Sequence, residues 1–482
     1  MKTNIKRVLS LMIAVLMAVT ALVPSFASSN DLLWQTSWEK EYENGVILFP
    51  GSDNSEMNVS WYSKTESEPK VVVSEGPVIT DNAKTFTGYC VETDYFDDYS
   101  NKVTITGLEP GKTYSYKCYS EGFESALYHF KTDEDANEFT ALYMTDIHIS
   151  GVIDEALNQD EVKRTAGIFN DTLNEAYLKH NPSLLLSAGD QASYGLENEY
   201  KGFASPLVLK SMPVATTIGN HDRKGVDYKT FTNMPNEQEN AMVSSYIGSN
   251  YWFTKGDVLF LVIDSNNGSG IDHRNFVKDA IKANPDAKWK IMMAHHDLYS
   301  GRIPSRESEN QLLRLLLAPI CDEFGIDLFL LGHSHYYTVS NVLYNGKTVS
   351  PYSSEMKDNE GTVYMVSGSI TRPRGDDDEI GLNEEWIGYA NTPDQRIIYN
   401  VLDFTEESIT VSSYYVGENA PFNSYKITKT SNDGGHPEQK FPSIIDAFVR
   451  FAGTIYAWFN NIGVYSDLKE DGFDVNFFEI VF

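Results

Sequence analysis

The chain has 482 residues, 41% of them hydrophobic, and 33 glycines; this is the composition of an ordinary globular protein and excludes global disorder. At roughly 100 to 200 residues per domain, the length predicts two or three domains. The formal net charge of -30 excludes nucleic acid as a bulk electrostatic partner. The same charge would slow an anionic substrate unless the binding pocket carried its own positive charge, such as metal ions.

Residues 1–27 have the pattern of a cleavable export signal. Positive charges within residues 1–7 precede an uncharged run, residues 8–23, that is shorter than the roughly 20 apolar residues of a membrane-spanning helix. Small residues then lead to a cleavage site after Ala27. We therefore expect a secreted or cell-surface, extracellular protein, with an uncleaved N-terminal anchor as the alternative.

The three cysteines, Cys90, Cys118 and Cys321, are too few for a disulfide scaffold and show no CxxC spacing, which excludes a structural zinc site built from thiolates. Cys90 and Cys118 both fall in a β-rich region. The sequence leaves open whether they form a disulfide, because it does not show how close their Cα atoms come. Cys321 is predicted to lie in a buried helix.

Residues 38–133 are predicted to form an all-β domain. Seven short alternating segments, rich in β-branched and aromatic residues, are separated by turn signals such as residues 107–111. The segments are residues 46–49, 57–62, 70–74, 85–91, 103–105, 113–118 and 126–130. Their spacing favours a β-sandwich. The domain resembles a fibronectin type III module, and in particular the N-terminal domain that accompanies purple acid phosphatases.

Residues 138–430 are predicted to form a layered α/β domain, because apolar strands alternate with amphipathic helices. The predicted strands are 139–145, 184–186, 214–217, 258–263, 290–293, 328–331, 396–404 and 409–415, and the predicted helices are 161–179, 276–283 and 311–324. Residues 431–482 are predicted to form a linker and an amphipathic helix over 443–462. This helix either docks on the rest of the chain or associates with a cell surface.

Five polar clusters, each at the carboxyl end of a predicted strand, carry nearly all of the functional information. They are Asp146-Ile147-His148, Gly189-Asp190, Gly219-Asn220-His221-Asp222, His295-His296 and Gly332-His333-Ser334-His335. An α/β sheet brings such strand ends together at one edge. Two neighbouring cations need one shared anionic ligand and separate imidazole and oxygen donors on each side. The clusters supply these residue types.

The order and types of the clusters resemble those of the calcineurin-like metallophosphoesterase superfamily, whose pattern runs DxH, GD, GNHD or GNHE, H, GHxH. The resemblance implies a four-layer α/β/β/α domain and two metal ions, with Fe, Mn and Zn all open as their identity. It also implies the ligands: Asp146, His148 and His335 for the first ion, Asn220, His295 and His333 for the second, and Asp190 bridging both.

The resemblance also implies roles in the reaction. A metal-bound hydroxide attacks phosphorus in line, and His221 stabilises the developing charge or protonates the leaving oxygen. Asp222 is interpreted as the group that orients the His221 imidazole, with a loop-capping carboxylate as the alternative. His296 either contacts substrate or only lines the pocket.

Two features depart from purple acid phosphatases. That family has a GDxxY block whose tyrosine binds iron, whereas here Tyr194 lies one residue further from Asp190 than the block requires. His148 stands where the family has a non-histidine residue, so we expect it to replace the tyrosine as a ligand. The charged run over residues 372–379 lacks EF-hand spacing and is predicted to be a solvated loop, with a lid or a calcium site as alternatives.

The sequence therefore predicts a secreted phosphoesterase with two metal ions that hydrolyses small phosphate monoesters. The preference for monoesters depends on the N-terminal domain alone, so a phosphodiesterase or nucleotidase of the same superfamily is the alternative. A non-catalytic cell-surface binding protein is a further alternative, against which the complete set of ligands argues.

Overall fold

The computed structural model describes residues 34–436, apart from 95–96, 151–157, 226, 247, 302–306, 375–380, 382, 392–393 and 432–434. The predicted export signal and the predicted helix over 443–462 lie outside the described residues. None of the helices in this part of the chain combines the length and the apolar character that a membrane span requires.

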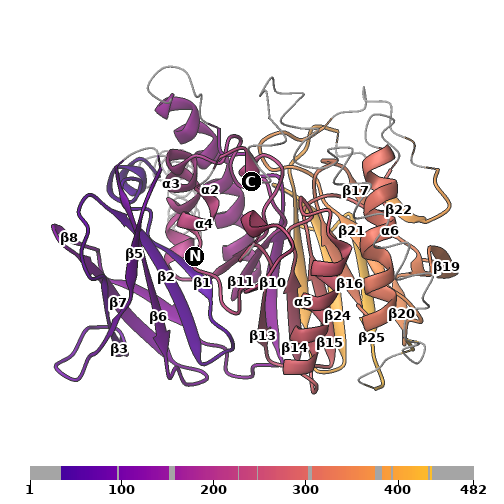
Figure 1. Ribbon diagram of the computed structural model, residues 1–482, viewed down its shortest axis with the longest axis horizontal. Helices are drawn as coiled ribbons and strands as arrows, with labels where there is room; N and C mark the ends of the chain where they lie inside the picture. Colours follow the sequence, from indigo (N-terminus) through magenta and orange to yellow (C-terminus); the bar gives the residue numbers. More distant parts are fainter. Residues whose placement is uncertain are drawn as a thin grey trace, which may run out of the picture.

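The N-terminal domain is a sandwich of two antiparallel sheets, at the left of Figure 1. Its strands are β1 (Ile47–Pro50), β2 (Glu56–Ser63), β3 (Lys70–Glu75), β4 (Lys84–Thr87), β5 (Tyr89–Glu92), β6 (Tyr99–Thr106), β7 (Thr113–Ser120), β8 (Phe123–Glu124) and β9 (Tyr128–Lys131). One sheet has the order β1-β2-β6-β5, and the other has the order β4-β3-β7-β8, with β9 also paired to β7. The predicted all-β sandwich is thereby confirmed.

Gly88 takes the chain from one sheet of the sandwich to the other. Strand β4 pairs with β3, whereas β5 pairs with β6. A Cβ atom at Gly88 would lie 1.8 Å from the carbonyl oxygen of Lys102, so the close approach requires glycine. The prediction of one strand over 85–91 is therefore wrong, because alternation of side chains does not reveal a change of partner strand.

All three cysteines are free. Cys90 lies on β5 and Cys118 on β7, in opposite sheets, and Cys118 is buried in the sandwich core beside Tyr116. The disulfide that the sequence left open is therefore not formed. Cys321 is buried in a helix, as predicted.

The C-terminal domain contains two seven-stranded sheets and their covering helices. The first sheet comprises β10 (Phe139–Met144), β11 (Leu184–Ser187), β12 (Val214–Thr216), β20 (Glu355–Lys357), β23 (Ile398–Phe404), β24 (Ser408–Tyr415) and β25 (Asn423–Thr428). The second comprises β13 (Tyr251–Lys255), β14 (Val258–Val262), β15 (Trp289–Met293), β16 (Leu328–Leu331), β17 (Tyr337–Ser340), β21 (Val363–Val366) and β22 (Ile387–Asn391). Strands β18 (Val342–Tyr344) and β19 (Lys347–Ser350) form a separate pair. The α-helices are α2 (Gln159–His180), α3 (Glu197–Ala204), α4 (Tyr228–Phe231), α5 (Gly270–Ala283) and α6 (Glu307–Phe324).

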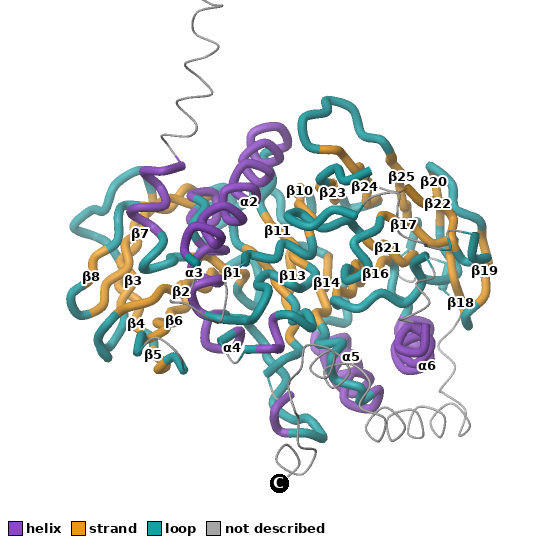
Figure 2. The backbone as a smooth tube through the Cα atoms, turned by 90° about the horizontal axis from the view of Figure 1, so that it is seen from above, coloured by secondary structure: helices purple, strands orange, loops and turns teal. Residues whose placement is uncertain are grey.

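The two sheets pack face to face. Their orders are β12-β11-β10-β23-β24-β25-β20 and β13-β14-β15-β16-β21-β17-β22. Seen from above in Figure 2, α2 lies outside the first sheet, and α5 and α6 lie outside the second. This arrangement confirms the predicted four-layer α/β/β/α architecture.

Alternating side chains of the second sheet face two different cores. On β14, Phe260 lies in the core between the sheets, whereas Leu259 and Leu261 lie in the core under α5 and α6. Strands buried on both faces read as continuous apolar runs, which is why the sequence revealed β14, β15 and β16. It missed strands near the sheet edge such as β22, whose residues are only half-buried.

The sandwich is fixed against the C-terminal domain by polar contacts. Ser60 Oγ donates a hydrogen bond to the carbonyl of Phe231 at 2.8 Å, at the end of α4. Lys201 of α3 forms an ion pair of 2.6 Å with the buried carboxylate of Asp98. Both contacts involve the side of the C-terminal domain that carries the first sheet.

Candidate metal centre

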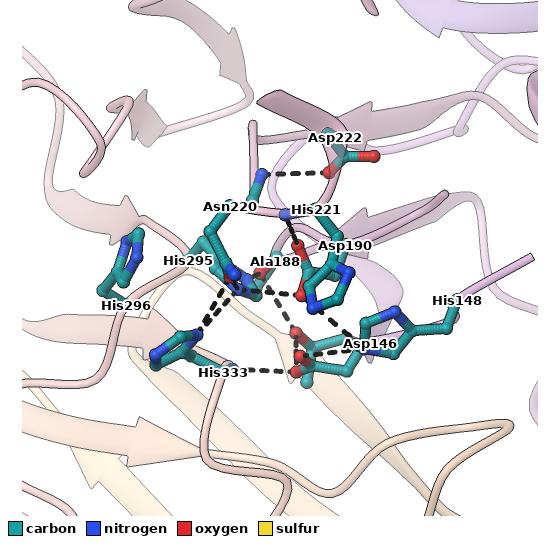
Figure 3. A network of polar contacts seen from close by, with 12 residues as sticks. Asp146, His148, Ala188, Asp190, Asn220, His221, Asp222, His295, His296 and His333 are labelled. Carbon is teal, nitrogen blue, oxygen red and sulfur yellow. Dashed lines mark hydrogen bonds and ion pairs between the residues drawn. The ribbon is translucent and has the colours of Figure 1, made fainter. Parts of the chain in front are cut away.

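The five polar clusters meet at one edge of the two sheets, where their side chains converge (Figure 3). The loops after β10, β11 and β12 of the first sheet carry Asp146, His148, Asp190, Asn220, His221 and Asp222. The loops after β15 and β16 of the second sheet carry His295, His296, His333 and His335. The structure therefore brings together every site residue that the sequence singled out.

The backbone of these loops is strained. Positive φ angles occur at Asp146 (52°), His148 (49°), Asp190 (54°), His333 (73°) and His335 (63°). Residues other than glycine rarely adopt this left-handed region, and each such residue costs on the order of 1 kcal/mol or more. Strained residues that cluster in one place are typical of a functional site, in which the direction of the side chains is maintained at a cost in backbone conformational energy.

Two glycines allow the loops to approach one another. A Cβ atom at Gly189 would lie 2.4 Å from Nδ1 of His295, and one at Gly219 would lie 2.0 Å from Oδ1 of Asp190. Both distances are impossible for a real side chain. The glycines that precede Asp190 and Asn220 are therefore required by the packing of the site.

The first donor group comprises Asp146, His148 and His335. Nε2 of His335 lies 3.1 Å from Oδ1 of Asp146 and 3.2 Å from Nε2 of His148. Nδ1 of His335 faces the carbonyl of Arg372 at 3.1 Å, so this nitrogen carries the proton. The Nε2 lone pair of His335 is thereby left for a ligand.

The second donor group comprises Asn220, His295 and His333. Oδ1 of Asn220 lies 3.0 Å from Nε2 of His295 and 3.1 Å from Nδ1 of His333, and the two nitrogens are 3.2 Å apart. Nδ1 of His295 faces the carbonyl of Ala188 at 2.9 Å, which fixes the orientation of the ring. Three donor atoms therefore point at one buried spot.

Asp190 lies between the two groups. Its Oδ2 atom is 3.2 Å from Nε2 of His295 and 3.6 Å from Nε2 of His148, and its Oδ1 atom accepts the backbone N–H of His221 at 2.9 Å. Donor atoms about 2.0 to 2.2 Å from one cation lie about 3 to 3.5 Å from one another, which matches the spacing within each group. The donor set therefore fits two cations, one on each side of Asp190.

The electrostatics of the cluster are those of a cation site. Burial opposes ionisation of Asp190, but His295 and His221 outweigh it and hold the pKa of this carboxyl well below its usual range. Burial lowers the pKa of His148 well below its ordinary value, so the ring is neutral, which is the metal-binding form. Burial also acts to lower the pKa of His295, but the Asp190 carboxylate raises it to about 10. His295 thus holds a proton that a bound cation would displace.

His221 stands beside the first donor group. Its ring meets the ring of His148 edge-on at 4.7 Å between centroids, and its Nδ1 atom lies 2.9 Å from the carbonyl of Ser193 and 3.1 Å from Nζ of Lys224. Burial and the charge of Lys224 lower its pKa, against the opposing charge of Asp190. The Ser193 carbonyl therefore sets the direction of this imidazole.

Asp222 does not orient His221. Its carboxylate accepts hydrogen bonds from the backbone N–H groups of Gly219 at 2.9 Å and Ala192 at 3.0 Å, and from the Tyr200 hydroxyl at 3.1 Å. Burial, reinforced by the charge of Asp190, raises its pKa to about 8. The interpretation of Asp222 as the orienting group is therefore wrong, and the loop-capping alternative fits.

His296 lies behind the second donor group and is fully buried. Its Nδ1 atom lies 2.8 Å from Oγ of Ser265, and its ring is 4.5 Å from that of His333. Nε2 atoms of His296 and His333 each lie 3.7 Å from a carboxylate oxygen of Glu309 on α6. This position fits the lining role for His296. Glu309 could not be recognised from the sequence, because a glutamate in an amphipathic helix carries no signal of a site.

Arg372 was also missed, because the run over 372–379 was predicted to be a solvated loop. Its carbonyl faces Nδ1 of His335, and its Nη2 atom donates to Oγ of Ser193 at 2.9 Å. The solvated-loop prediction is therefore wrong for Arg372. Residues 375–379 lie outside the described part of the chain.

Comparison with known families identifies both domains. Residues 139–337 match the model of the calcineurin-like phosphoesterases, and residues 43–132 match that of the purple acid phosphatase N-terminal domain. The first range contains both donor groups and Asp190. The chain therefore contains a calcineurin-like phosphoesterase domain and a purple acid phosphatase N-terminal domain, and these families imply a binuclear metal centre.

Individual relatives are distant. The chain is 23% identical to acid phosphatase type 7 of Mus musculus over 291 residues, which is 56% of this chain and 64% of that protein. It is 21% identical to acid phosphatase type 7 of Danio rerio over 382 residues, covering 72% and 82%. The match to the mouse protein thus spans less than two thirds of that protein's length.

Solved structures share the fold. Purple acid phosphatase PPD1 from yellow lupin (Lupinus luteus) seeds superposes with a TM-score of 0.67 at 16% identity, covering 83% of this chain and 77% of that one. PhoD superposes with a TM-score of 0.56 at 14% identity, covering 88% and 98%. At these identities the likeness concerns the fold alone.

Proposed function

We propose that this protein hydrolyses phosphate monoesters with the help of two metal ions. The observation that carries the proposal is the position of Asp190, whose Oδ2 atom faces His295 on one side and His148 on the other. A carboxylate shared by two sets of nitrogen and oxygen donors suits a pair of cations. The phosphoesterase domain and the relatives named acid phosphatase support the same reaction class.

In this proposal Asp146, His148 and His335 hold one ion, Asn220, His295 and His333 hold the other, and Asp190 holds both. Imidazole and carboxylate donors suit Fe, Mn and Zn. When bound, the ions would activate the attacking water and stabilise the charge that develops on the phosphoryl oxygens.

The residues also determine the charge of the site. Only Asp146 and Asp190 among the seven proposed ligands are anionic, because Asn220 contributes a neutral amide oxygen. Two divalent cations therefore leave the site positive, which would attract a phosphate into a chain whose net charge is -30.

His221 is proposed to act on the substrate. The Ser193 carbonyl accepts from Nδ1, so Nε2 of His221 is the nitrogen that can give a proton to the leaving oxygen. The negative charge of a bound phosphate would favour the protonated ring and oppose the lowering of its pKa by burial.

Two finer features of the proposal rest on sequence. The monoester preference is supported by the purple acid phosphatase N-terminal domain. Export is supported by residues 1–27, and mass spectrometry of the mature protein is expected to find Ser28 as its first residue. The helix that the sequence predicts over residues 443–462, and its association with a cell surface, stay predictions.

The experiment that tests the proposed function is hydrolysis of p-nitrophenyl phosphate beside its bis-ester, by protein stripped with a chelator and reloaded with Mn, Zn or Fe. We expect turnover that depends on the metal and is faster with the monoester. Faster turnover of the diester would overturn the monoester preference. A folded protein that binds no cation and turns over neither ester would contradict the whole proposal.

A further inference from the structure

Helix α3 lies beside the sandwich in Figure 1, at the boundary between the two domains. All of its residues are buried. Three consecutive residues of the helix, Glu199, Tyr200 and Lys201, each contact a different part of the molecule. The helix therefore touches the sandwich and the loops of the metal centre at the same time.

Lys201 connects α3 to the sandwich through a buried ion pair. Its Nζ atom lies 2.6 Å from Oδ2 of Asp98 and 2.7 Å from Oε1 of Glu197, and these three side chains are at most 5% exposed. Lys64 of the sandwich lies 2.5 Å from the other oxygen of Asp98, so it holds this carboxylate from within its own domain. Buried charges must be compensated where they lie. The pair therefore fixes how α3 sits against the sandwich.

Glu199 holds the loop after β11. Its carboxylate accepts hydrogen bonds from the backbone N–H groups of Tyr194 at 3.0 Å, Leu196 at 3.1 Å and Ser193 at 3.3 Å. Ser193 is the residue whose carbonyl lies 2.9 Å from Nδ1 of His221. The position of α3 therefore determines where this partner of the His221 imidazole lies.

Tyr200 and Gly202 connect α3 to two further loops of the metal centre. The Tyr200 hydroxyl donates to Oδ1 of Asp222 at 3.1 Å, and the other oxygen of Asp222 accepts the N–H of Gly219 at 2.9 Å. A Cβ atom at Gly202 would lie 2.9 Å from Cγ2 of Ile149, so the helix lies directly against the loop after β10. A displacement of α3 would thus move the loops after β10, β11 and β12 together.

We propose that Asp98 of the sandwich is a positioning residue for the reaction, because it fixes α3 and α3 holds three loops of the metal centre. The inference rests on the proposed function and gives the N-terminal domain a part in it. In this proposal Asp98 acts through Lys201 and the helix, not by contact with a ligand or the substrate. A displacement of about 1 Å in a positioned group can lower a rate about a hundredfold, so a small shift of α3 is enough to change catalysis.

The test compares two changes at the domain interface in the metal-loaded full-length protein, with p-nitrophenyl phosphate as the substrate. Asp98→Asn weakens the contact with α3, whereas the matched control Ser60→Ala removes the hydrogen bond of 2.8 Å to the carbonyl of Phe231 on α4. We expect both variants to have a lower Tm, but only Asp98→Asn to have a lower kcat, by about tenfold.

Glu199→Gln tests the other end of the same path, because it weakens the hold of α3 on the loop after β11. We expect a similar fall in kcat. In the double variant of Asp98→Asn and Glu199→Gln the two effects on kcat should not add, because both act through the position of one loop. Titration of Mn into stripped protein, followed by calorimetry, is expected to show weaker cation binding in Asp98→Asn than in Ser60→Ala.

The outcomes separate the inference from the proposed function. Equal values of kcat in Asp98→Asn and Ser60→Ala, or fully additive effects of Asp98→Asn and Glu199→Gln, would overturn the inference while turnover by the wild type still stands. If Asp98→Asn does not fold, Lys64→Gln replaces it, because Lys64 is exposed and pairs with the same carboxylate. Its kcat is expected to fall about twofold, and an unchanged kcat would overturn the inference. Absence of turnover by the wild-type protein with every metal would overturn the proposed function and this inference with it.

Discussion

The two sheets make different contributions to the metal centre. The loops of the first sheet supply both carboxylates of the proposed ligand set, Asp146 and Asp190, whereas the loops after β15 and β16 of the second sheet supply imidazoles. Asp146 faces His335 at 3.1 Å, and Asp190 faces His295 at 3.2 Å. Each close pair therefore joins an acid from one sheet to a histidine from the other.

This division teaches that neither sheet holds a complete cation site. A bound pair of ions would connect the sheets at their common edge, so metal binding, catalysis and the packing of the two sheets are expected to be linked. Substitutions in the loops of the first sheet and in those of the second sheet should therefore differ in their effects on activity, metal binding and stability.

The largest effect is expected for Asp190→Asn, which removes the shared carboxylate. We expect kcat for the monoester to fall by roughly a thousandfold or more, because the two ions lose the anionic ligand between them. Activity and bound metal per chain would be measured together. Asp403→Asn is the control, because Asp403 is an exposed carboxylate that accepts from Thr140 Oγ1. Wild-type activity in Asp190→Asn would show that the two proposed cation sites need no shared carboxylate.

Removal of metal comes next. A cation present at a thousand times its dissociation constant stabilises the folded state by about 4 kcal/mol, so a chelator is expected to lower Tm substantially. His295→Gln should reduce this metal-dependent gain, because it removes the donor that faces both Asn220 and Asp190. Calorimetry with and without chelator checks this. An identical Tm in both conditions would mean that the ions do not link the sheets.

His221→Asn tests a first-sheet residue that is not a proposed ligand. We expect kcat to fall about a hundredfold, the usual size of a lost general acid, with metal content unchanged. Steady-state kinetics with elemental analysis measures both quantities, and His180→Asn at the end of α2 is the control. Loss of metal in His221→Asn would make this residue a ligand and contradict its assignment.

The smallest effect concerns a carboxylate on the covering helix of the second sheet. Burial raises the pKa of Asp322 from 3.8 to about 6. Its folded form binds a proton more tightly than its unfolded form, so this stabilisation is present below pH 3.8 and is lost as pH rises through 6. Asp322→Asn can still accept the N–H of Asn345, which lies 2.9 Å from Oδ2.

Relative to the wild type, Asp322→Asn should therefore gain stability on the order of 2 kcal/mol between pH 4 and pH 7. Thermal unfolding at several pH values measures the difference, with Asp279→Asn on the exposed face of α5 as the control. If the difference in Tm between Asp322→Asn and the wild type did not change with pH, the raised pKa of Asp322 would be contradicted.

Much of this fold could be predicted because its local signals agree. Strands β14, β15 and β16 are buried on both faces and read as apolar runs, and the polar residues that follow them mark the strand ends. Gly189 and Gly219 precede site residues because no side chain fits there. These are local requirements, which a sequence records directly.

The rest depends on contacts between distant residues. Asp222 caps a loop because its carboxylate accepts hydrogen bonds from the backbone N–H groups of Ala192 and Gln191. These groups lie in another loop, and the residues next to Asp222 in the sequence do not predict the contact. Arg372 reaches the site only because Ser369 and His335 hold its backbone. The change of sheet at Gly88 depends on the approach of Lys102, which alternation of side chains cannot show.

The most direct test of the central claim is the position of the bound metals. A crystal of the protein soaked with Mn or Zn would be examined by anomalous scattering. We expect two peaks roughly 3.5 to 4 Å apart on either side of Asp190, one near Asp146, His148 and His335 and one near Asn220, His295 and His333. A single peak, or peaks away from Asp190, would contradict a two-ion centre at the common edge of the two sheets.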